Sequence, residues 1–325
     1  MAKYFQISAV KQIFAAAYLG LVPGFSLENT NIPGYDELSH GFDFNRLRAE
    51  FTLEHDQYPD IMATVIVDNE TLYRGNPGTL TNDTSIYRAY LEYSGASHYW
   101  VIGKQRIPLG VGKFWNPIDV FNPINIQAIE SNERPGTETI RYEYAINELS
   151  NIDVNIAKGK GSIRVKGYLA FADVALIGEW DEKSNLDIQG WEIEGELADT
   201  GIELRSEGGS FHNRESGRRH SEFILGAEYG FANSLVLLGE YHYLDALDID
   251  QIGLSASFIP AILWTFSVLS VTDLDDGSGF ISPVLEYSLS DEMTLSAGAF
   301  FYHGPDESNL GVGSNRFYLH WFIHF

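Results

Sequence analysis

Cysteine is absent from the 325-residue sequence, and no apolar run is long enough to form a membrane-spanning helix. The first absence excludes disulfide bonds, thiolate metal sites and covalently attached haem. The second, together with a mean hydropathy of −0.13, excludes a polytopic helical membrane protein, which needs runs of about 20 apolar residues. No linker or low-complexity tract follows residue 40, so we expect a single domain from there on.

Basic residues are scarce in this chain. The sequence has 21 Lys and Arg against 45 Asp and Glu, and its net charge is −24. Residues 1–170 hold 15 of the basic and 19 of the acidic residues, whereas residues 171–325 hold 6 and 26. A general affinity for nucleic acid is excluded, because phosphates attract an excess of Lys and Arg.

The sequence motifs of common hydrolases and metal sites are also missing. The nine His show no H-E-x-x-H or other close ligand spacing, and no G-x-S-x-G nucleophile motif occurs. The sequence therefore predicts no catalytic residue, no metal site and no cofactor.

The first residues are typical of a secretory leader. Two lysines precede the short apolar run Ile13–Val22, which contains several small residues. This pattern indicates a signal peptide, predicted over residues 1–25, before a mature domain of residues 26–325. The cleavage point stays open between Ala15–Ala17 and Gly24–Ser26, and an ordinary buried helix is the alternative.

Beyond residue 40, large apolar residues alternate with polar ones along most of the chain. Leu47, Ala49, Phe51 and Leu53 fall on one face of such a segment, and arginines, glutamates and Thr52 fall on the other. A period of two residues is that of a β-strand, whose successive side chains point to opposite faces. About 17 segments of this kind occur, and no stretch after the leader has a helical period of useful length.

The connections between these segments alternate between short turns and longer polar loops. Turns such as SGASH and INELS alternate with loops such as YRGNPGTLTNDTS and FHNRESGRRH. This arrangement is typical of transmembrane β-barrels, whose outer face meets lipid while charged side chains face a wet interior. The sequence thus predicts an all-β fold, an antiparallel barrel in the outer membrane of a Gram-negative bacterium. A soluble propeller is the alternative, although no blade repeat supports it.

The number of strands follows from the same interpretation. Single-chain bacterial barrels have an even number of strands, so we expect 16 or 18 rather than 17. Eighteen would be reached if residues 24–35 form a weak first strand.

The chain ends on an alternating segment, RFYLHWFIHF. Phe317, Leu319, Trp321, Ile323 and Phe325 form an apolar row, and the opposite face is mixed or polar. A last strand with a terminal Phe resembles the C-terminal signal by which outer-membrane barrels are recognised for assembly. The resemblance implies that Phe317, Trp321 and Phe325 meet the barrel-assembly machinery and then the lipid and lipopolysaccharide of the membrane.

One long segment, residues 107–136, departs from the alternation. It is rich in Pro and Gly and contains Phe114, Trp115 and Phe121. A loop of this length is usually functional or disordered, and disordered loops lack such a density of aromatic residues. We therefore expect the three aromatic side chains to be packed against other parts of the protein.

This segment also carries a family resemblance. Residues 103–123, GKQRIPLGVGKFWNPIDVFNP, resemble the early part of general outer-membrane porins, where a strand end leads into a long third loop. The resemblance implies a channel whose loop folds into the lumen and narrows it. A loop packed over the mouth of the barrel is the alternative.

Alternation places basic side chains of the early segments and acidic side chains of the later ones on the inner face. The basic set is Arg46, Arg48, Arg88, Lys104, Arg106, Arg141, Arg164 and Lys166, and the acidic set is Glu192, Glu194, Glu196, Glu203, Glu207, Glu222, Glu228 and Glu240. Opposite charges across a narrow lumen create a transverse field that orients dipolar solutes. Solvation and local pairing of these charges is the alternative.

The resemblance to porins implies where the narrowest point lies. The residues expected to line the constriction are Arg46, Arg48, Arg88, Lys104, Arg106 and Arg141 of the wall, with Asp119 and Glu130 of the loop.

These features favour a porin that lets small hydrophilic solutes or ions diffuse passively, rather than an enzyme. The resemblance leaves a homotrimer open. One alternative is a sheath barrel that holds a cytochrome partner in its lumen, since the chain itself binds no haem. A lipid-modifying outer-membrane enzyme is a weaker alternative.

Overall fold

The fold is a single sheet of antiparallel strands. The computed structural model describes residues 19–32, 41–55, 57–75, 78–131, 133–305, 308–310 and 313–325. Within these ranges the sheet has 18 strands. They are β1 (Leu19–Ile32), β2 (Phe42–His55), β3 (Ile61–Arg74), β4 (Thr79–Ser94), β5 (His98–Gln105), β6 (Thr137–Asn147), β7 (Ser150–Ala157), β8 (Lys160–Leu169), β9 (Ala172–Asp181), β10 (Leu186–Glu196), β11 (Ile202–Asn213), β12 (Arg219–Gly230), β13 (Leu235–Leu244), β14 (Ile249–Ala261), β15 (Trp264–Asp273), β16 (Gly279–Ser290), β17 (Met293–His303) and β18 (Arg316–His324). No helix in the described ranges is long and apolar enough to span a membrane.

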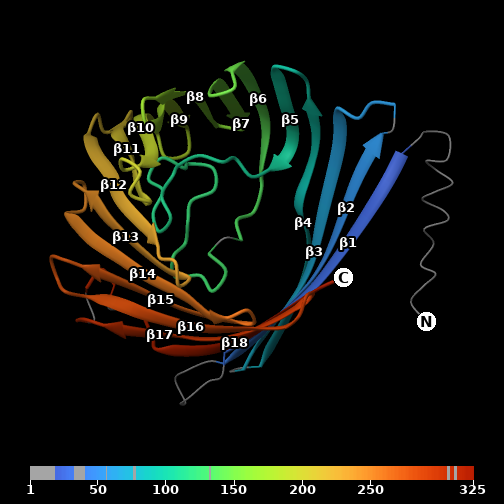
Figure 1. The fold of residues 1–325 in the computed structure, drawn as a ribbon, viewed down its shortest axis with the longest axis vertical. Coiled ribbons are helices and arrows are strands. Elements are labelled where there is room, and N and C mark those ends of the chain that lie inside the picture. The colour runs from blue at the N-terminus through green and yellow to red at the C-terminus, as the bar shows by residue number, and fades with distance from the viewer. Residues whose placement is uncertain are drawn as a thin grey trace.

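The sheet closes on itself between its first and last strands. β1 pairs with β18 from Ser26 opposite His324 to Asn31 opposite Leu319. The backbones of Phe25 and Phe325 exchange two hydrogen bonds of 2.9 and 2.8 Å at the end of this seam. Every other strand pairs with its neighbours in sequence, so the ribbon forms a ring (Figure 1). Closure joins the first strand to the last, and the predicted antiparallel barrel is confirmed with 18 strands among the described residues.

The extra strand is β1, which contains most of the weak first strand expected in residues 24–35. Its residues before Phe25 pair with β2 alone, because β18 ends opposite that residue. Residues 1–18 of the predicted signal peptide lie outside the described residues, and residues 19–25 belong to β1. Barrel closure therefore uses β1 only from Phe25 onward, and the cleavage point stays a prediction.

One connection differs from the sequence-based expectation. The segment YRGNPGTLTNDTS was expected to be a long loop, but β3 extends to Arg74 and β4 begins at Thr79. Asn69 and Asn82 exchange side-chain hydrogen bonds across this hairpin at 3.3 and 3.2 Å, and each also bonds a threonine hydroxyl at 2.7 Å. Such polar cross-strand pairs stabilise a hairpin without the apolar alternation that indicates a strand in the sequence.

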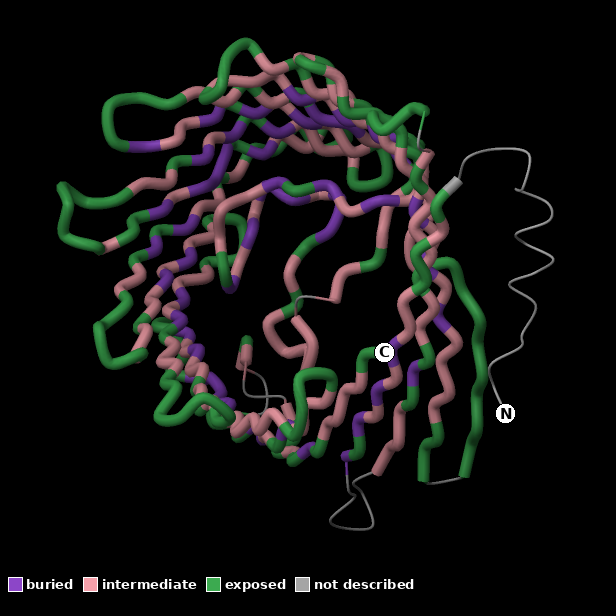
Figure 2. Tube along the Cα trace, turned by 45° about the vertical axis from the view of Figure 1, so that its right-hand side comes forward, coloured by how far each residue is buried: buried purple, intermediate pink, exposed green. Residues whose placement is uncertain are grey.

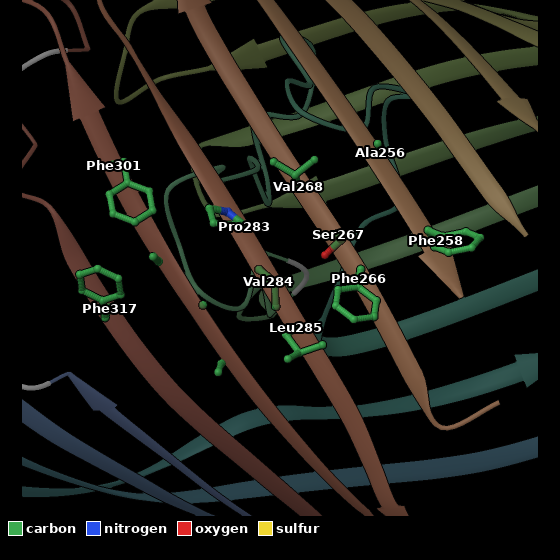
Figure 3. Close-up of a pocket in the computed structure, with 13 residues that line it drawn as sticks. Ala256, Phe258, Phe266, Ser267, Val268, Pro283, Val284, Leu285, Phe301 and Phe317 are labelled. Carbon is green, nitrogen blue, oxygen red and sulfur yellow. The ribbon is translucent and has the colours of Figure 1, made fainter. Parts of the chain in front are cut away.

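The outer face of the barrel is apolar. Ile102, Ile140 and Leu176 are examples of the large side chains that the alternation sends outward. On the outside of β14–β18, four rings frame a shallow apolar groove with small residues between them (Figure 3). The rings are those of Phe258, Phe266, Phe301 and Phe317. A surface of this kind suits contact with lipid chains.

The inner face is largely polar, and two clusters of apolar residues lie in the interior. One consists of Ile32, Val271, Phe280, Phe300 and Tyr318, from β1 and β15–β18, and is called the apolar wall patch below. The other consists of Ile107, Leu109 and Phe121, all from the connection between β5 and β6. Residues of that connection pack against both clusters, so the packed interior lies where the connection crosses the barrel.

Candidate functional site: the lumen loop and the wall around it

The connection between β5 and β6 folds into the barrel. We call residues 106–136 the lumen loop, with residues 106–124 as its first arm, 125–129 as its tip and 130–136 as its second arm. The loop leaves the wall and crosses the interior in both views (Figures 1 and 2), and much of its first half is buried. Inward side chains of strands on several sides of the ring contact it. This position supports the inward fold expected from the resemblance over the alternative of a loop on the barrel mouth.

The first arm of the lumen loop is held by three wall carboxylates through its backbone. We call Glu192 of β10, Glu207 of β11 and Glu240 of β13 the carboxylate clamp. Each residue is no more than 2% exposed. They accept hydrogen bonds from five consecutive N–H groups: Gly110 to Glu192 at 2.7 Å, Val111 and Gly112 (2.8 Å) to Glu207, and Lys113 and Phe114 to Glu240, both at 2.7 Å.

The clamp solves a problem that a loop inside a barrel creates. Irregular backbone has no strand partner, and each buried N–H group needs an acceptor. A carboxylate accepts two such bonds, and charge-assisted bonds of this kind are about twice as strong as neutral ones. Because these acids are used to bind the loop, they do not form the simple acidic arc that the sequence suggested.

Two aromatic residues of the first arm pack into the wall. The Phe114 ring lies against Gly253 of β14, where a Cβ would come within 2.5 Å of it. Trp115 stacks on His242 of β13 with ring centres 5.1 Å apart, and His242 lies 2.8 Å from a Glu222 oxygen. Phe114 and Trp115 therefore each pack against a specific residue of the wall, Gly253 and His242.

Phe121 packs inside the loop itself. It contacts Ile107 and Leu109 in the second apolar cluster, and the Lys160 ammonium lies 5.2 Å from its ring centre. The same ammonium donates to the carbonyl of Val120 at 2.8 Å. A basic residue of β8 thus contacts the loop, although the sequence did not single it out.

The tip of the lumen loop packs on the apolar wall patch. Ile126 and Ile129 of the tip pack against it, as does Trp115 of the first arm. Arg316 of β18 donates to the carbonyl of Gln127 at 2.6 Å. Its guanidinium also lies 4.3 Å from the ring centre of Phe300. This contact was not predicted, because the alternation in the sequence indicated no apolar role for the inner face of β15–β18.

The prediction that Asp119 lines the constriction is wrong, because the residue is buried within the loop. It is 3% exposed and accepts hydrogen bonds from the N–H groups of Phe121 at 3.0 Å and Asn122 at 2.7 Å. Asn116 also donates to it at 3.0 Å, and Arg134 of the second arm lies 3.5 Å away. Burial raises the pKa of Asp119 to about 6, although these N–H groups and the nearby Arg134 and Arg106 lower it. Asp119 therefore stabilises the turn at residues 119–122 by accepting these backbone hydrogen bonds.

The second arm of the loop meets basic residues of β2. Arg46 lies 2.9 Å from Glu130 and 2.5 Å from Glu28 of β1. Arg48 makes paired contacts of 2.7 and 2.8 Å with Asp68 and of 3.1 and 3.0 Å with Glu133. The structure thus brings Arg46, Arg48 and Glu130 together, as the constriction hypothesis requires. Glu133 was missed, because one acid among many in an irregular segment has no distinguishing spacing.

The other predicted basic residues divide into three cases. Arg88 lies near the second arm, with its Nη2 3.5 Å from the Arg134 carbonyl. Arg106 begins the loop and lies close enough to Asp119 and Arg134 for its charge to lower the pKa of both groups. Arg141 is held by Asp153 at 2.6 Å and Glu143 at 2.7 Å on the wall.

The prediction that Lys104 lines the constriction is also wrong, because this residue lies on the outer row of β5. Val101 and Gln105 are buried on the inner row of β5, whereas Trp100 and Ile102 are exposed on the outer row. Lys104 follows the outer row, and its ammonium bonds to the carbonyl of Ile86. The prediction failed because it grouped Lys104 with Arg106, which lies beyond the end of the strand.

Many inward charges of the wall form local pairs. Arg164 lies 2.7 Å from Glu192, and Lys166 pairs with Asp173 at 2.5 Å. Arg205 lies within 3.5 Å of three glutamates, Glu194, Glu203 and Glu228. For these residues the alternative of local pairing describes the structure better than a field across an open lumen.

The predicted assembly residues lie on the last strand. Phe317 is exposed on the outer row and contacts the Phe301 ring at 5.3 Å between centres. Trp321 belongs to the same row and lies opposite Asn29 of β1. Phe325 is exposed and stacks on Phe25 with ring centres 6.0 Å apart. Their position matches the predicted row, and their part in assembly stays a prediction.

Solved structures with the same architecture include several bacterial porins. OccK5 (OpdH) of Pseudomonas aeruginosa has a TM-score of 0.66 at 8% identity, over 94% of this chain and 98% of that one. OccAB4 of Acinetobacter baumannii has a TM-score of 0.63 at 9% identity, over 93% and 97%. OmpF of Salmonella typhi, solved in complex with daunomycin, has a TM-score of 0.55 at 13% identity, over 94% and 97%.

The fold is that of the outer-membrane porins. The coverage of both chains shows that the likeness extends over the whole barrel, and the low identities limit it to the fold. No protein-family model matches the sequence, and no curated protein is similar to it in sequence.

Proposed function

We propose that the chain is a porin of a bacterial outer membrane, through which small hydrophilic solutes or ions diffuse passively. The porin-type fold and the apolar outer face support the location, where lipid and lipopolysaccharide surround the barrel. The observation that carries the function is the lumen loop, which lies inside the barrel and is fixed to β2, β10, β11, β13 and β18 by charged groups. A loop held in this position narrows the passage through the barrel and leaves the wall of strands intact.

The sheath alternative is less well supported. A barrel that holds a cytochrome needs free space in its lumen, and the loop with its aromatic side chains takes up part of that space. A homotrimer stays part of the proposal, since the outer groove of β14–β18 offers an apolar surface to lipid or to a second copy.

The absence of Cys makes a direct test simple, because a single introduced thiol is the only one in the chain. Lys113 and Asn125 are exposed residues of the lumen loop, and Ile102 is an exposed residue of the outer row. In planar bilayers, a charged methanethiosulfonate should reduce the single-channel conductance of Lys113→Cys and Asn125→Cys. Ile102→Cys is the matched control and should keep its conductance.

Two results would refute the proposal. One is the absence of single-channel steps from the folded wild-type protein. The other is a conductance that changes for Ile102→Cys and not for the loop variants, because solutes would then not pass beside the loop.

A further inference from the structure

Three metal-ligating side chains meet at the seam of the barrel. They are Glu28 of β1, Glu130 of the lumen loop and His320 of β18. One ligand atom from each lies within 4.8 Å of the other two. The segments that carry them are distant in sequence, and only barrel closure together with the inward fold of the loop brings them into one place.

The wall positions of this cluster are held by their neighbours. Thr30 lies opposite His320 across the seam, and its hydroxyl is 2.8 Å from the imidazole Nδ1. This contact orients the ring and leaves Nε2 for another partner, as the partners of metal-bound His commonly do. Glu28 is 4% exposed, and its Oε1 is buried without a hydrogen-bond partner among the described residues. A buried carboxylate oxygen with no partner is costly, and a cation would satisfy it.

Arg46 already contacts two of the three ligands, so a cation must share them with it. Its Nη2 lies near one oxygen of Glu28 and one of Glu130, at 2.5 and 2.9 Å. Its Nη1 also has Glu70 at 3.8 Å and Glu133 at 3.9 Å. The guanidinium therefore keeps partners if it withdraws from the seam.

The local charge favours an additional cation. Five carboxylates surround the two guanidiniums of Arg46 and Arg48: those of Glu28, Asp68, Glu70, Glu130 and Glu133. The five carboxylates outnumber the two guanidiniums, so the cluster keeps an excess of negative charge. A divalent ion would bring the cluster closer to balance.

We propose that Glu28, Glu130 and His320 form a binding site for a divalent transition cation, with Zn²⁺ as the best match. One imidazole nitrogen and two carboxylate oxygens are a donor set that Zn²⁺ accepts, and the open positions would be filled by water. Such an ion would fasten the second arm of the lumen loop to the junction of the first and last strands. The site does not depend on which solute passes through the barrel.

The test measures Zn²⁺ binding to the full-length protein in detergent by titration calorimetry. The wild type should bind one Zn²⁺ per chain at this site, and His320→Gln should weaken that binding at least tenfold. His324→Gln is the matched control, because His324 lies on the same inner row of β18 and outside the cluster. It should bind within twofold of the wild type.

Folding is checked for each variant by its heat-modifiable band in SDS gels. If His320→Gln does not fold, Glu130→Gln replaces it, since a loop residue leaves the strands intact, and it should also lose at least tenfold. A second readout is the temperature at which the folded band is lost. Zn²⁺ should raise it in the wild type and in His324→Gln, and not in the ligand variants.

Equal Zn²⁺ affinity in the wild type and the folded ligand variants would overturn the proposal, and so would no saturable binding by the wild type. Single-channel current from the same preparation tests the proposed porin function separately. A protein that conducts and binds no Zn²⁺ would refute the cation site alone.

Discussion

Gly253 determines how closely the lumen loop approaches the wall at one point. A Cβ there would lie 2.5 Å from the Phe114 ring, which has no free space to move into because it is 8% exposed. We expect Gly253→Val to displace the ring at a cost of about 1–3 kcal/mol, the usual range for overpacking. The fraction of time with a displaced loop should rise about tenfold or more, seen as added noise in single-channel current.

The control for this change is Gly230→Ala, since a Cβ at Gly230 would have no atom within 4 Å. Current noise that is the same for Gly253→Val and Gly230→Ala would show that Phe114 does not hold the loop.

Glu240 provides a second test at the scale of one residue. Each of its oxygens accepts one loop N–H, from Lys113 or from Phe114. In Glu240→Gln one of these N–H groups would face an amide NH₂, and the charge would be lost. A bond to a charged group contributes about 1.5–3 kcal/mol, so loop-dependent current fluctuations should become roughly tenfold more frequent.

Glu203→Gln makes the same chemical change outside the carboxylate clamp. Glu203 is largely exposed and contacts Arg205 at 3.4 Å. Glu203→Gln should leave the current fluctuations unchanged. An equal effect of Glu203→Gln and Glu240→Gln would contradict the role of the carboxylate clamp.

At the scale of the element, β18 combines closure of the barrel with the predicted assembly signal. Phe325 pairs its backbone with Phe25 and exposes its ring on the outer row. Phe325→Asp would place a charge among the lipid-facing residues and remove the terminal aromatic group. We expect the yield of folded protein in outer-membrane fractions to fall at least tenfold, measured by the heat-modifiable band.

His324→Asp is the matched control, because it adds the same charge one residue away on the inner row. Its yield should stay near that of the wild type. Equal yields for Phe325→Asp and His324→Asp would count against a special role for the last residue.

At the scale of the whole molecule, the net charge of −24 predicts a mild preference for cations. Negative charge along a passage raises the local concentration of counter-ions. The preference should fade as salt rises, because the Debye length falls from about 30 Å at 0.01 M to about 3 Å at 1 M. The measurement is the reversal potential under a KCl gradient across a planar bilayer.

Two matched variants locate the charges that matter. Lys113→Glu changes an exposed residue of the lumen loop, and Lys183→Glu makes the same change in the exposed turn between β9 and β10. Lys113→Glu should increase cation preference more than Lys183→Glu does. Anion preference of the wild type in dilute salt would show that the arginines near the second arm control the narrowest point.

Much of the fold could be predicted from the sequence. Alternation in a strand such as β2 separates Leu47 and Phe51 from Arg46 and Arg48, because a period of two has only two faces. The same local rule places Lys104 on the outer row of β5, and the prediction failed because it grouped Lys104 with Arg106 beyond the strand end. The rule also gives no signal for the polar hairpin of β3 and β4. There, side-chain hydrogen bonds take the place of the apolar pattern.

The candidate site could be predicted only in part. The aromatic content of residues 107–136 indicated a packed loop, since Phe114 and Trp115 need burial. It could not show that Glu192, Glu207 and Glu240 bind the loop backbone, because an inward glutamate has the same sequence pattern whether it meets water or an N–H group. The buried position of Asp119 could not be predicted either, since it depends on turns within the loop.

The sequence by itself determined most of the strands, their two faces, the lipid-facing terminal row and the existence of a packed loop. All of these depend on residues that are near one another in the chain. Only the tertiary structure decided which wall groups the loop meets and that Glu28, Glu130 and His320 share one place at the seam. Ring closure and the inward fold of the loop create those contacts, and no spacing along the chain encodes them.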